Sequence, residues 1–413
     1  MQQPPLKGIR VIAIESGAAG PDASKSLGEL GADVIKLEWR ANLDFMRTTS
    51  GPDIHRSAGF NEANRNKRSF AVDLRSAKGV KIARKLISMS DIVIDSFRGG
   101  MVENLVLGYE DVRKFKPDII YLSSCGYGRG GPITSRQAYG PLNAAMSGVQ
   151  YLWSHPDDPY PAGGSVPHPD YTAALHGIVA ILAALDYRRR TGKGQFIDLA
   201  QAETAAAMIG EFYLEYTVNN RVPRPTGNRS LWAAPHGCYR CKGNDEWCAI
   251  SIFTNEEWHQ FCGAIGKPEW TRRLEFTDLP SRLRNVDELD RLVEEWTTPR
   301  DARDVVHTLQ AAGIAAGKVQ RGADMLDDPQ LRAVGGIIEV DHAVVGKQFY
   351  PGIPFKLSNA PPLKSTSPVL YGEHTEEICH ELLKMSDEEI ESLRKEDVVE
   401  TTSDWFKRQQ KKA

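Results

Sequence analysis

The first half of the 413-residue sequence predicts an α/β protein built around a parallel sheet. Short runs of β-branched and aliphatic residues alternate there with segments whose apolar residues recur at helical spacing. The runs are apolar at nearly every position, which is typical of strands that helices cover on both faces. We therefore expect a doubly wound, Rossmann-like domain in this part of the chain.

The first strand–helix–strand unit lies near the N-terminus. Strands are expected at residues 9–14 (IRVIAI) and 32–38 (ADVIKLE). The intervening sequence SGAAGPDASKSLGELG predicts a glycine-rich turn that leads into a helix. A turn in this position suits a backbone-lined pocket for phosphates or a nucleotide.

The alternation continues further along the chain. A helix is expected from Asp170 to about Arg190, and another over residues 201–219. Composition shifts to Pro, Gly, Asn and Arg at residues 220–230, where we place a linker. Further strands are expected at 69–74, 91–97, 118–126, 194–200, 314–320 and 335–342, a hairpin at 238–252, and helices near 255–265, 286–297 and 300–312.

Composition and charge narrow the function class. The chain is 41% hydrophobic and 25% charged, which is ordinary for a soluble globular protein. Its net charge is -3 and no basic tract stands out, so we expect no nucleic-acid partner. No window reaches the roughly 18 consecutive apolar residues that a membrane span needs, so we expect no span. The N-terminus lacks the features of a signal peptide, and a cytoplasmic location is expected.

The sequence predicts no metal site and no dinucleotide site. Cys238 and Cys241 form a C-x-x-C pair without a second pair at suitable spacing, and the six cysteines are too scattered for a disulfide framework. The stretch GYGRGG (126–131) matches a dinucleotide fingerprint formally. However, Pro132 follows at once, and no acidic residue lies about twenty residues on.

One carboxylate, Asp170, stands where a proline-bracketed loop meets a long apolar helix. Aspartate at a helix start is a favoured N-cap that stabilises the helix by about 1 kcal/mol. The same position suits a nucleophilic carboxylate, because the positive end of the helix dipole favours the anion. Local sequence does not separate these two interpretations.

The order of motifs is more specific than any one of them. It runs LKGIRVIAI, AGP, LGADVIKLE, NRNKRSFAVDL, SDIVIDSFRGG, GYGRGGP and PDYTAALHGIVAILAALDYRRRTGKGQFIDLAQAE, followed by GIAAGKVQ, DDPQLRA, GIPFKLSNAPP and GEHTEEI. From about residue 6 to residue 395, this order resembles the class III CoA-transferase family, which includes formyl-CoA and crotonobetaine CoA-transferases. The family is related to the α-methylacyl-CoA racemases.

The resemblance implies a Rossmann-like large domain formed by both chain ends, with a smaller inserted α+β domain. We expect the large domain at residues 1–220 and 326–413 and the small domain, with its linkers, at 221–325. It further implies an interlocked dimer, either of identical chains or with a paralogous subunit.

The resemblance assigns the acyl-accepting nucleophile to Asp170 and implies CoA as substrate, with no permanently bound cofactor and no metal. It implies contacts with CoA at Gly17, Ala18, Arg40, Arg75, Ser96, Phe97 and Tyr139. Arg40 lies one residue past the usual basic position, which is Trp39 here.

Two departures from the family pattern narrow the activity. Tyr139 stands where racemases carry a catalytic histidine, and a racemase needs an acid/base pair on opposite faces of the α-carbon. Gly140 lacks the carboxylate of formyl-CoA transferases, and the small-domain segment RSLWAAPHGCYRC lacks their glycine-rich flap.

We expect a CoA-transferase that uses an acyl-CoA donor such as succinyl-CoA and a larger, partly apolar acid such as benzylsuccinate. The bulky residues Trp39, Trp153, Tyr139 and Trp232 point to such an acid. The alternatives are a 2-methylacyl-CoA racemase or epimerase, and a non-catalytic subunit of a hetero-oligomeric CoA-transferase.

Overall fold

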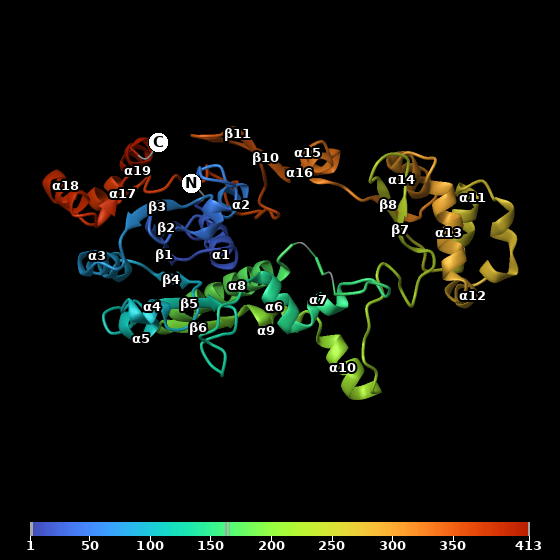
Figure 1. Ribbon diagram of the computed structural model, residues 1–413, viewed down its shortest axis with the longest axis horizontal. Coiled ribbons are helices and arrows are strands. Elements are labelled where there is room, and N and C mark those ends of the chain that lie inside the picture. The colour runs from blue at the N-terminus through green and yellow to red at the C-terminus, as the bar shows by residue number, and fades with distance from the viewer. Residues whose placement is uncertain (1–2, 162, 165, 412–413) are drawn as a thin grey trace. The chain divides into compact units, whose positions relative to one another are not determined.

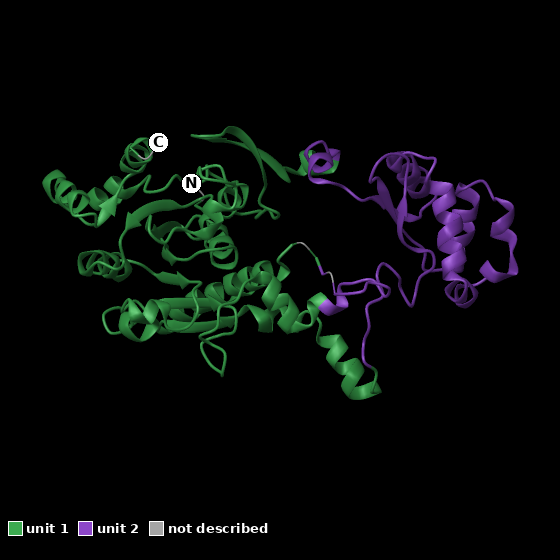
Figure 2. Ribbon diagram, in the orientation of Figure 1, with its two compact units in different colours: residues 1–150, 164–221, 330–413 green, residues 151–163, 222–329 purple. Residues whose placement is uncertain are grey.

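The computed structural model describes residues 3–161, 163–164 and 166–411. The chain divides into two compact units (Figure 2). The large unit comprises residues 1–150, 164–221 and 330–413, and the small unit comprises residues 151–163 and 222–329. The segment 151–163 belongs to the small unit although it precedes the linker in sequence.

The large unit is built on a seven-stranded sheet in the order β12-β3-β2-β1-β4-β5-β6 (Figure 1). All neighbouring strands pair in parallel except β12, which is antiparallel to β3. The strands are β1 (Arg10–Ile14), β2 (Asp33–Glu38), β3 (Arg68–Val72), β4 (Ile92–Asp95), β5 (Ile120–Cys125), β6 (Gln195–Ala200) and β12 (Val399–Glu400). The predicted α/β class with a parallel sheet is therefore confirmed.

Both faces of this sheet are covered by helices, as the continuously apolar strands predicted. On one face, Val11 and Ala13 of β1 pack with α1 (Ala19–Glu29) and α8 (His168–Thr191). On the other face, Ile12 and Ile14 belong to a core shared with the remaining helices of the layer. These are α3 (Ala77–Ser88), α4 (Met101–Asn104), α5 (Tyr109–Val112), α17 (Thr375–Glu381) and α18 (Asp387–Lys395).

Shorter elements complete the large unit. A separate antiparallel hairpin is formed by β10 and β11. The segment after β6, predicted as one helix, is two: α9 and α10, which begins at Gly210. The bounds are η1 (Phe45–Thr48), α2 (Ala58–Ala63), α6 (Gly140–Ser147), α9 (Gln201–Ala207), α10 (Gly210–Asn219), β10 (Ile337–His342), β11 (Gly346–Pro351) and α19 (Thr402–Gln410). Two further helices, α7 (Val149–Leu152) and α16 (Pro329–Val334), cross the sequence boundary between the two units.

The small unit has its own core between a three-stranded antiparallel sheet, β7-β8-β9, and helices. The first two strands form the expected hairpin, and the segment 314–320 supplies the third strand. The bounds are β7 (His236–Arg240), β8 (Trp247–Ser251), β9 (Ala315–Lys318), α11 (Asn255–Ala264), η2 (Glu269–Arg272), η3 (Leu274–Phe276), α12 (Leu279–Arg284), α13 (Val286–Thr297), α14 (Ala302–Ala311) and α15 (Gly322–Leu326).

Within the described residues, the longest apolar helices fall short of what a bilayer crossing requires. The apolar helix α8 instead packs along the sheet through alanine, isoleucine and glycine residues.

Candidate functional site

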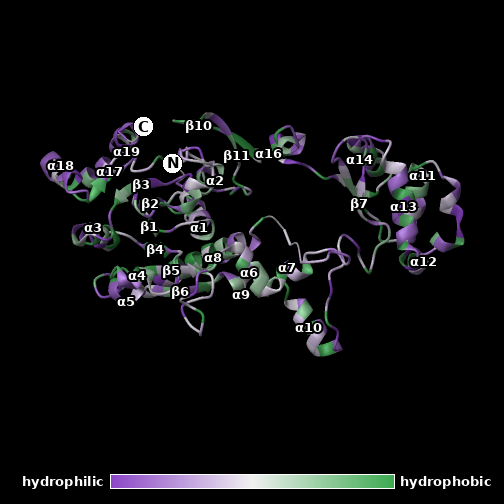
Figure 3. Cartoon of the chain, viewed as in Figure 1, coloured by the Kyte–Doolittle hydropathy of each residue, from purple (hydrophilic) through white to green (hydrophobic). Residues whose placement is uncertain are grey.

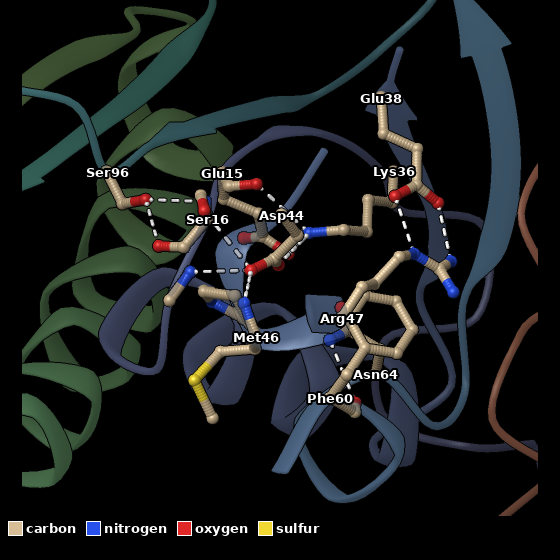
Figure 4. Close-up of polar contacts among 12 residues, drawn as sticks. Glu15, Ser16, Lys36, Glu38, Asp44, Met46, Arg47, Phe60, Asn64 and Ser96 are labelled. Carbon is tan, nitrogen blue, oxygen red and sulfur yellow. Dashed lines mark hydrogen bonds and ion pairs between the residues drawn. The ribbon is translucent and has the colours of Figure 1, made fainter. Parts of the chain in front are cut away.

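The strand order of the large sheet reverses between β1 and β4, which places a crevice at the carboxyl ends of these strands. The chain leaves β1 through Glu15, Ser16 and Gly17 and leaves β4 through Ser96. The Ser96 hydroxyl accepts a hydrogen bond from Ser16 N and donates one to Ser16 O, each at 3.0 Å (Figure 4). These two bonds tie the glycine-rich turn to the neighbouring strand end.

The same turn is held from its other side by the buried carboxylate of Asp44 (Figure 4). Its Oδ1 accepts hydrogen bonds from Gly17 N at 3.0 Å and from Ser16 Oγ at 3.1 Å. Its Oδ2 lies 3.0 Å from the buried Nζ of Lys36. Burial opposes ionisation, but the Lys36 ammonium and the Gly17 N–H hold the pKa of Asp44 below its usual range.

A second buried ion pair lies beneath the turn. Lys67 Nζ donates to Glu15 Oε1 at 2.8 Å, to Pro21 O at 2.9 Å and to Asn64 Oδ1 at 2.8 Å. Burial lowers the pKa of the Lys67 amine to about 8. Lys36 Nζ also donates to Glu15 O at 3.0 Å. The turn therefore rests on four buried charges, each of which has a partner.

Gly17 meets two requirements that other residues do not. Its φ of +90° lies in the left-handed region, which glycine adopts without a steric penalty. A Cβ atom at this position would also lie 3.0 Å from Cε1 of Phe45. The exposed Phe45 ring thus packs directly on the backbone of the turn.

Asp170 is the third residue of α8, and Pro167 occupies the N-cap position. Of the two interpretations of Asp170 left open by the local sequence, the N-cap is therefore wrong, because α8 begins earlier, at His168. Among the described residues no hydrogen bond or ion pair engages the Asp170 carboxylate, and burial raises its pKa to about 6. The carboxyl is about nine-tenths ionised at pH 7, one unit above that pKa.

The Asp170 carboxylate lies against the first residue of α6. A Cβ atom on Gly140 would lie 2.5 Å from Asp170 Oδ2 and 2.4 Å from Cβ of Pro167. Glycine at this position therefore allows the close approach of α6 to the start of α8. The sequence showed only that a carboxylate is missing here, whereas the structure shows that a side chain would collide with Asp170.

Tyr139 connects the turn to Asp170. Its ring meets Phe45 edge to face, with centroids 5.5 Å apart, and its hydroxyl accepts a hydrogen bond from Gln137 Nε2 at 2.5 Å. The next residue is Gly140, which touches the Asp170 carboxylate. Gly17, Phe45, Tyr139, Gly140 and Asp170 thus form a continuous row of neighbours in the large unit.

The remaining predicted residues lie near the same edge of the sheet but have other partners. Arg40, which follows β2, pairs with Glu400 and Asp397 at 3.1 Å each. Arg75, which follows β3, pairs with Asp73 at 3.0 Å and is otherwise exposed. Both guanidinium groups remain partly accessible to an anion at the carboxyl edge.

Two other predicted residues lie beside the crevice. Ala18 precedes α1, and its carbonyl accepts the hydrogen bond of Asp22 N at 2.8 Å. Phe97 N donates to Asp95 Oδ1 at 3.1 Å, and the Phe97 ring packs partly buried against the core. A separate cavity of about 390 Å³ is lined by residues such as Tyr109, Arg129 and Phe196 and includes none of the predicted site residues.

Sequence reasoning missed Lys36, Asp44, Phe45 and Lys67. One signal was present, because Lys36 interrupts an otherwise apolar strand and so needs a buried partner. Phe45 carried no such signal. In the part of the chain that the structure describes, no group of three or more His, Cys, Asp or Glu side chains is arranged to hold a metal ion.

Known proteins resemble this chain over most of its length. The model of CoA-transferase family III matches residues 6–375. The chain is 32% identical to the beta subunit of succinyl-CoA–L-malate CoA-transferase from Chloroflexus aurantiacus, over 96% of this chain and 98% of the relative. It is 30% identical to the succinyl-CoA:glutarate CoA-transferase of Mus musculus, over 96% and 90% of the two chains.

A solved structure supports the fold. The crystal structure of a CAIB/BAIF family protein from Brucella suis has a TM-score of 0.84 and is 31% identical, covering 92% of this chain and all of that one.

We predict that Asp44→Ala lowers the free energy of unfolding by about 3–5 kcal/mol, because it leaves the buried Lys36 ammonium with the Glu15 carboxylate, 3.8 Å away, in place of its 3.0 Å ion pair. Urea unfolding followed by circular dichroism measures the change. The matched control is Glu110→Ala, which removes the exposed partner of Arg113 and should cost less than about 1 kcal/mol. Equal losses in the two variants would contradict the assigned role of the buried pair.

Proposed function

The chain belongs to CoA-transferase family III and acts as a CoA-transferase, and from this premise we propose that Asp170 is its acyl-accepting nucleophile. The observation that carries the proposal is the state of this carboxylate. It is largely withdrawn from water and has no partner among the described residues, yet its pKa of about 6 leaves it ionised at neutral pH. A carboxylate in this state is available as a nucleophile.

The proposed reaction proceeds by exchange at carbonyl carbons. The Asp170 carboxylate attacks the thioester carbonyl of the donor acyl-CoA, and the CoA thiolate leaves as a mixed anhydride forms. The thiolate then attacks the aspartyl carbonyl, releases the donor acid as its carboxylate and leaves an aspartyl-CoA thioester. The acceptor carboxylate attacks this thioester, and the same steps in reverse yield the new acyl-CoA and free Asp170.

We place CoA in the crevice between the carboxyl ends of β1 and β4. Gly17 and Ala18 offer backbone to the CoA chain, because the turn is held open by Asp44 and Ser96. Arg40 and Arg75, at the same edge of the sheet, are the proposed phosphate contacts, since a guanidinium suits phosphate geometry.

For the substrates, we propose succinyl-CoA as donor and a larger, partly apolar acid such as benzylsuccinate as acceptor. Relatives named for succinyl-CoA support the donor. The exposed aromatic pair of Phe45 and Tyr139 beside Asp170 supports an apolar substituent on the acceptor.

We also propose that a second chain completes the assembly as an interlocked dimer. Helix α10 buries none of its residues, although it carries Tyr213, Leu214, Tyr216 and Val218 (Figure 3). Helix α8 likewise exposes Leu175 and Val179. Apolar surface of this extent favours association with another chain. That chain is a second copy or a paralogue, since related enzymes have alpha and beta subunits.

We predict that Asp170→Asn lowers CoA transfer by at least about a thousandfold, because the amide is a far weaker nucleophile than the carboxylate. The measurement is the rate of acyl-CoA formation, combined with mass spectrometry of wild-type enzyme treated with succinyl-CoA and hydroxylamine. A hydroxamate should form at Asp170. Asp186→Asn, on the exposed face of the same helix, is the control and should keep wild-type activity. Full activity in Asp170→Asn would refute the assignment.

We predict that kcat/KM rises between pH 5 and pH 7 with an apparent pKa near 6. The folded-state pKa of Asp170 is raised by burial, so the reactive anion is lost as the pH falls through about 6. Circular dichroism over the same range checks that the fold persists. A rate that is flat over this range, or that falls only near pH 4, would exclude the proposed titration.

We predict that Leu214→Lys combined with Val218→Lys converts the assembly to monomers, because each charge would be buried against a second chain. Light scattering after size-exclusion chromatography measures the mass. Leu274→Lys, on the exposed surface of the small unit, should leave the mass unchanged. A wild-type chain that is itself monomeric would disprove the proposed assembly.

A further inference from the structure

Phe45 combines an exposed ring with a firmly held backbone. Its N–H donates to Ser16 Oγ at 3.2 Å, and its carbonyl accepts from Thr48 Oγ1 at 2.8 Å. The two residues that flank Phe45 are joined to each other, because the buried Asp44 carboxylate accepts a hydrogen bond from Met46 N at 3.1 Å (Figure 4). The Phe45 residue nevertheless remains 41% exposed. Its position is therefore set by the buried charges below it and not by burial of the ring.

The exposed face of Phe45 is shared with Tyr139, which is 45% exposed. The two rings meet edge to face at 5.5 Å, an arrangement that aromatic pairs favour. A single exposed apolar residue needs no explanation, but two adjoining rings on a pinned segment form a small rigid apolar surface.

This surface lies between the turn and the nucleophile. At one end, the Phe45 ring is 3.0 Å from where a Cβ of Gly17 would be. At the other end, Tyr139 precedes Gly140, whose Cβ would lie 2.5 Å from Asp170 Oδ2. The aromatic pair is therefore joined to the Asp170 carboxyl through a single residue, Gly140.

The bulky residues singled out from the sequence are differently placed. Trp39 is 5% exposed and covered by the Arg40 guanidinium, 4.2 Å from its ring centroid, so it offers no face to a substrate. Trp153 and Trp232 belong to the small unit. Within the large unit, Phe45 and Tyr139 remain exposed, as does Tyr171, which follows Asp170 in α8.

We propose that Phe45 is a specificity-determining residue that selects acids bearing an apolar or aromatic substituent near the carboxyl group. The inference rests on the proposed role of Asp170. In the acyl-enzyme stage, the substituent of the acid lies on the Phe45–Tyr139 surface and displaces water from both rings. An acid without a substituent gains nothing from this contact, so the surface discriminates in kcat/KM.

The test compares Phe45→Ala and Phe45→Leu with wild-type enzyme, using succinyl-CoA and four acceptors: benzylsuccinate, 3-phenylpropanoate, isotopically labelled succinate and propanoate. Phe45→Ala should lower kcat/KM for the two aromatic acids by about 10- to 100-fold, and by less than about threefold for the unsubstituted ones. Phe45→Leu should retain part of the preference, because it keeps apolar area. Phe355→Ala, at an exposed aromatic residue elsewhere in the large unit, should change none of the four values.

Three results would overturn the inference. They are an equal loss for all four acids, an unchanged profile in Phe45→Ala, and a wild-type enzyme that prefers the unsubstituted acids. Hydroxylamine trapping with succinyl-CoA alone separates these from failure of the proposed function. A hydroxamate at Asp170 in both wild-type and Phe45→Ala enzyme, with an unchanged acceptor profile, would sink only the role of Phe45. If no hydroxamate forms at Asp170 of the wild-type enzyme, the proposed role of Asp170 is refuted, and the inference about Phe45 is refuted with it.

Discussion

The buried ion pair between Lys36 and Asp44 is the constraint on which the rest of the site depends. Lys36 lies inside a strand of the sheet, and Asp44 lies on the segment that follows it. Neither charge is stable in the interior alone, so each requires the other. Once paired, Asp44 also holds Gly17 N and Ser16 Oγ. This ion pair thereby helps to fix both the turn at the end of β1 and the backbone that presents Phe45, together with the Ser96 bonds and the Lys67–Glu15 pair.

Buried Asp44 and partly buried Asp170 illustrate how environment divides the roles of two carboxylates. Asp44 has an ammonium and two backbone N–H groups as partners, and its pKa is lowered. Asp170 has burial without such partners, and its pKa is raised to about 6. The first arrangement consumes the lone pairs of the carboxylate in structural contacts. The environment of Asp170 leaves the lone pairs of its carboxylate available. Gly140 allows α6 to approach this carboxylate without a side chain that would collide with it.

The sequence predicted the sheet well because its strands are short and continuously apolar, and because the signal is local. The expected strand at 32–38 is β2 at Asp33–Glu38, and the expected helix from Asp170 is α8. Helix ends and the shortest strand could not be predicted, because they depend on contacts between residues that are distant in sequence. The N-cap of α8 is Pro167, the two-residue β12 exists only through pairing with β3, and Gly210 begins a second helix where one was expected. The family resemblance supplied Asp170, but the contact of Gly140 with it and the pairing of Phe45 with Tyr139 join residues far apart in sequence.

A crystal structure of the enzyme with a non-hydrolysable acyl-CoA analogue tests the central claim most directly. We predict that CoA passes over Gly17 and Ala18 in the crevice between β1 and β4. The carbonyl carbon of the analogue should then lie within about 3.5 Å of an Asp170 carboxylate oxygen, the separation of a near-attack conformer. An analogue bound with its carbonyl beyond the reach of Asp170, or at another edge of the sheet, would contradict it.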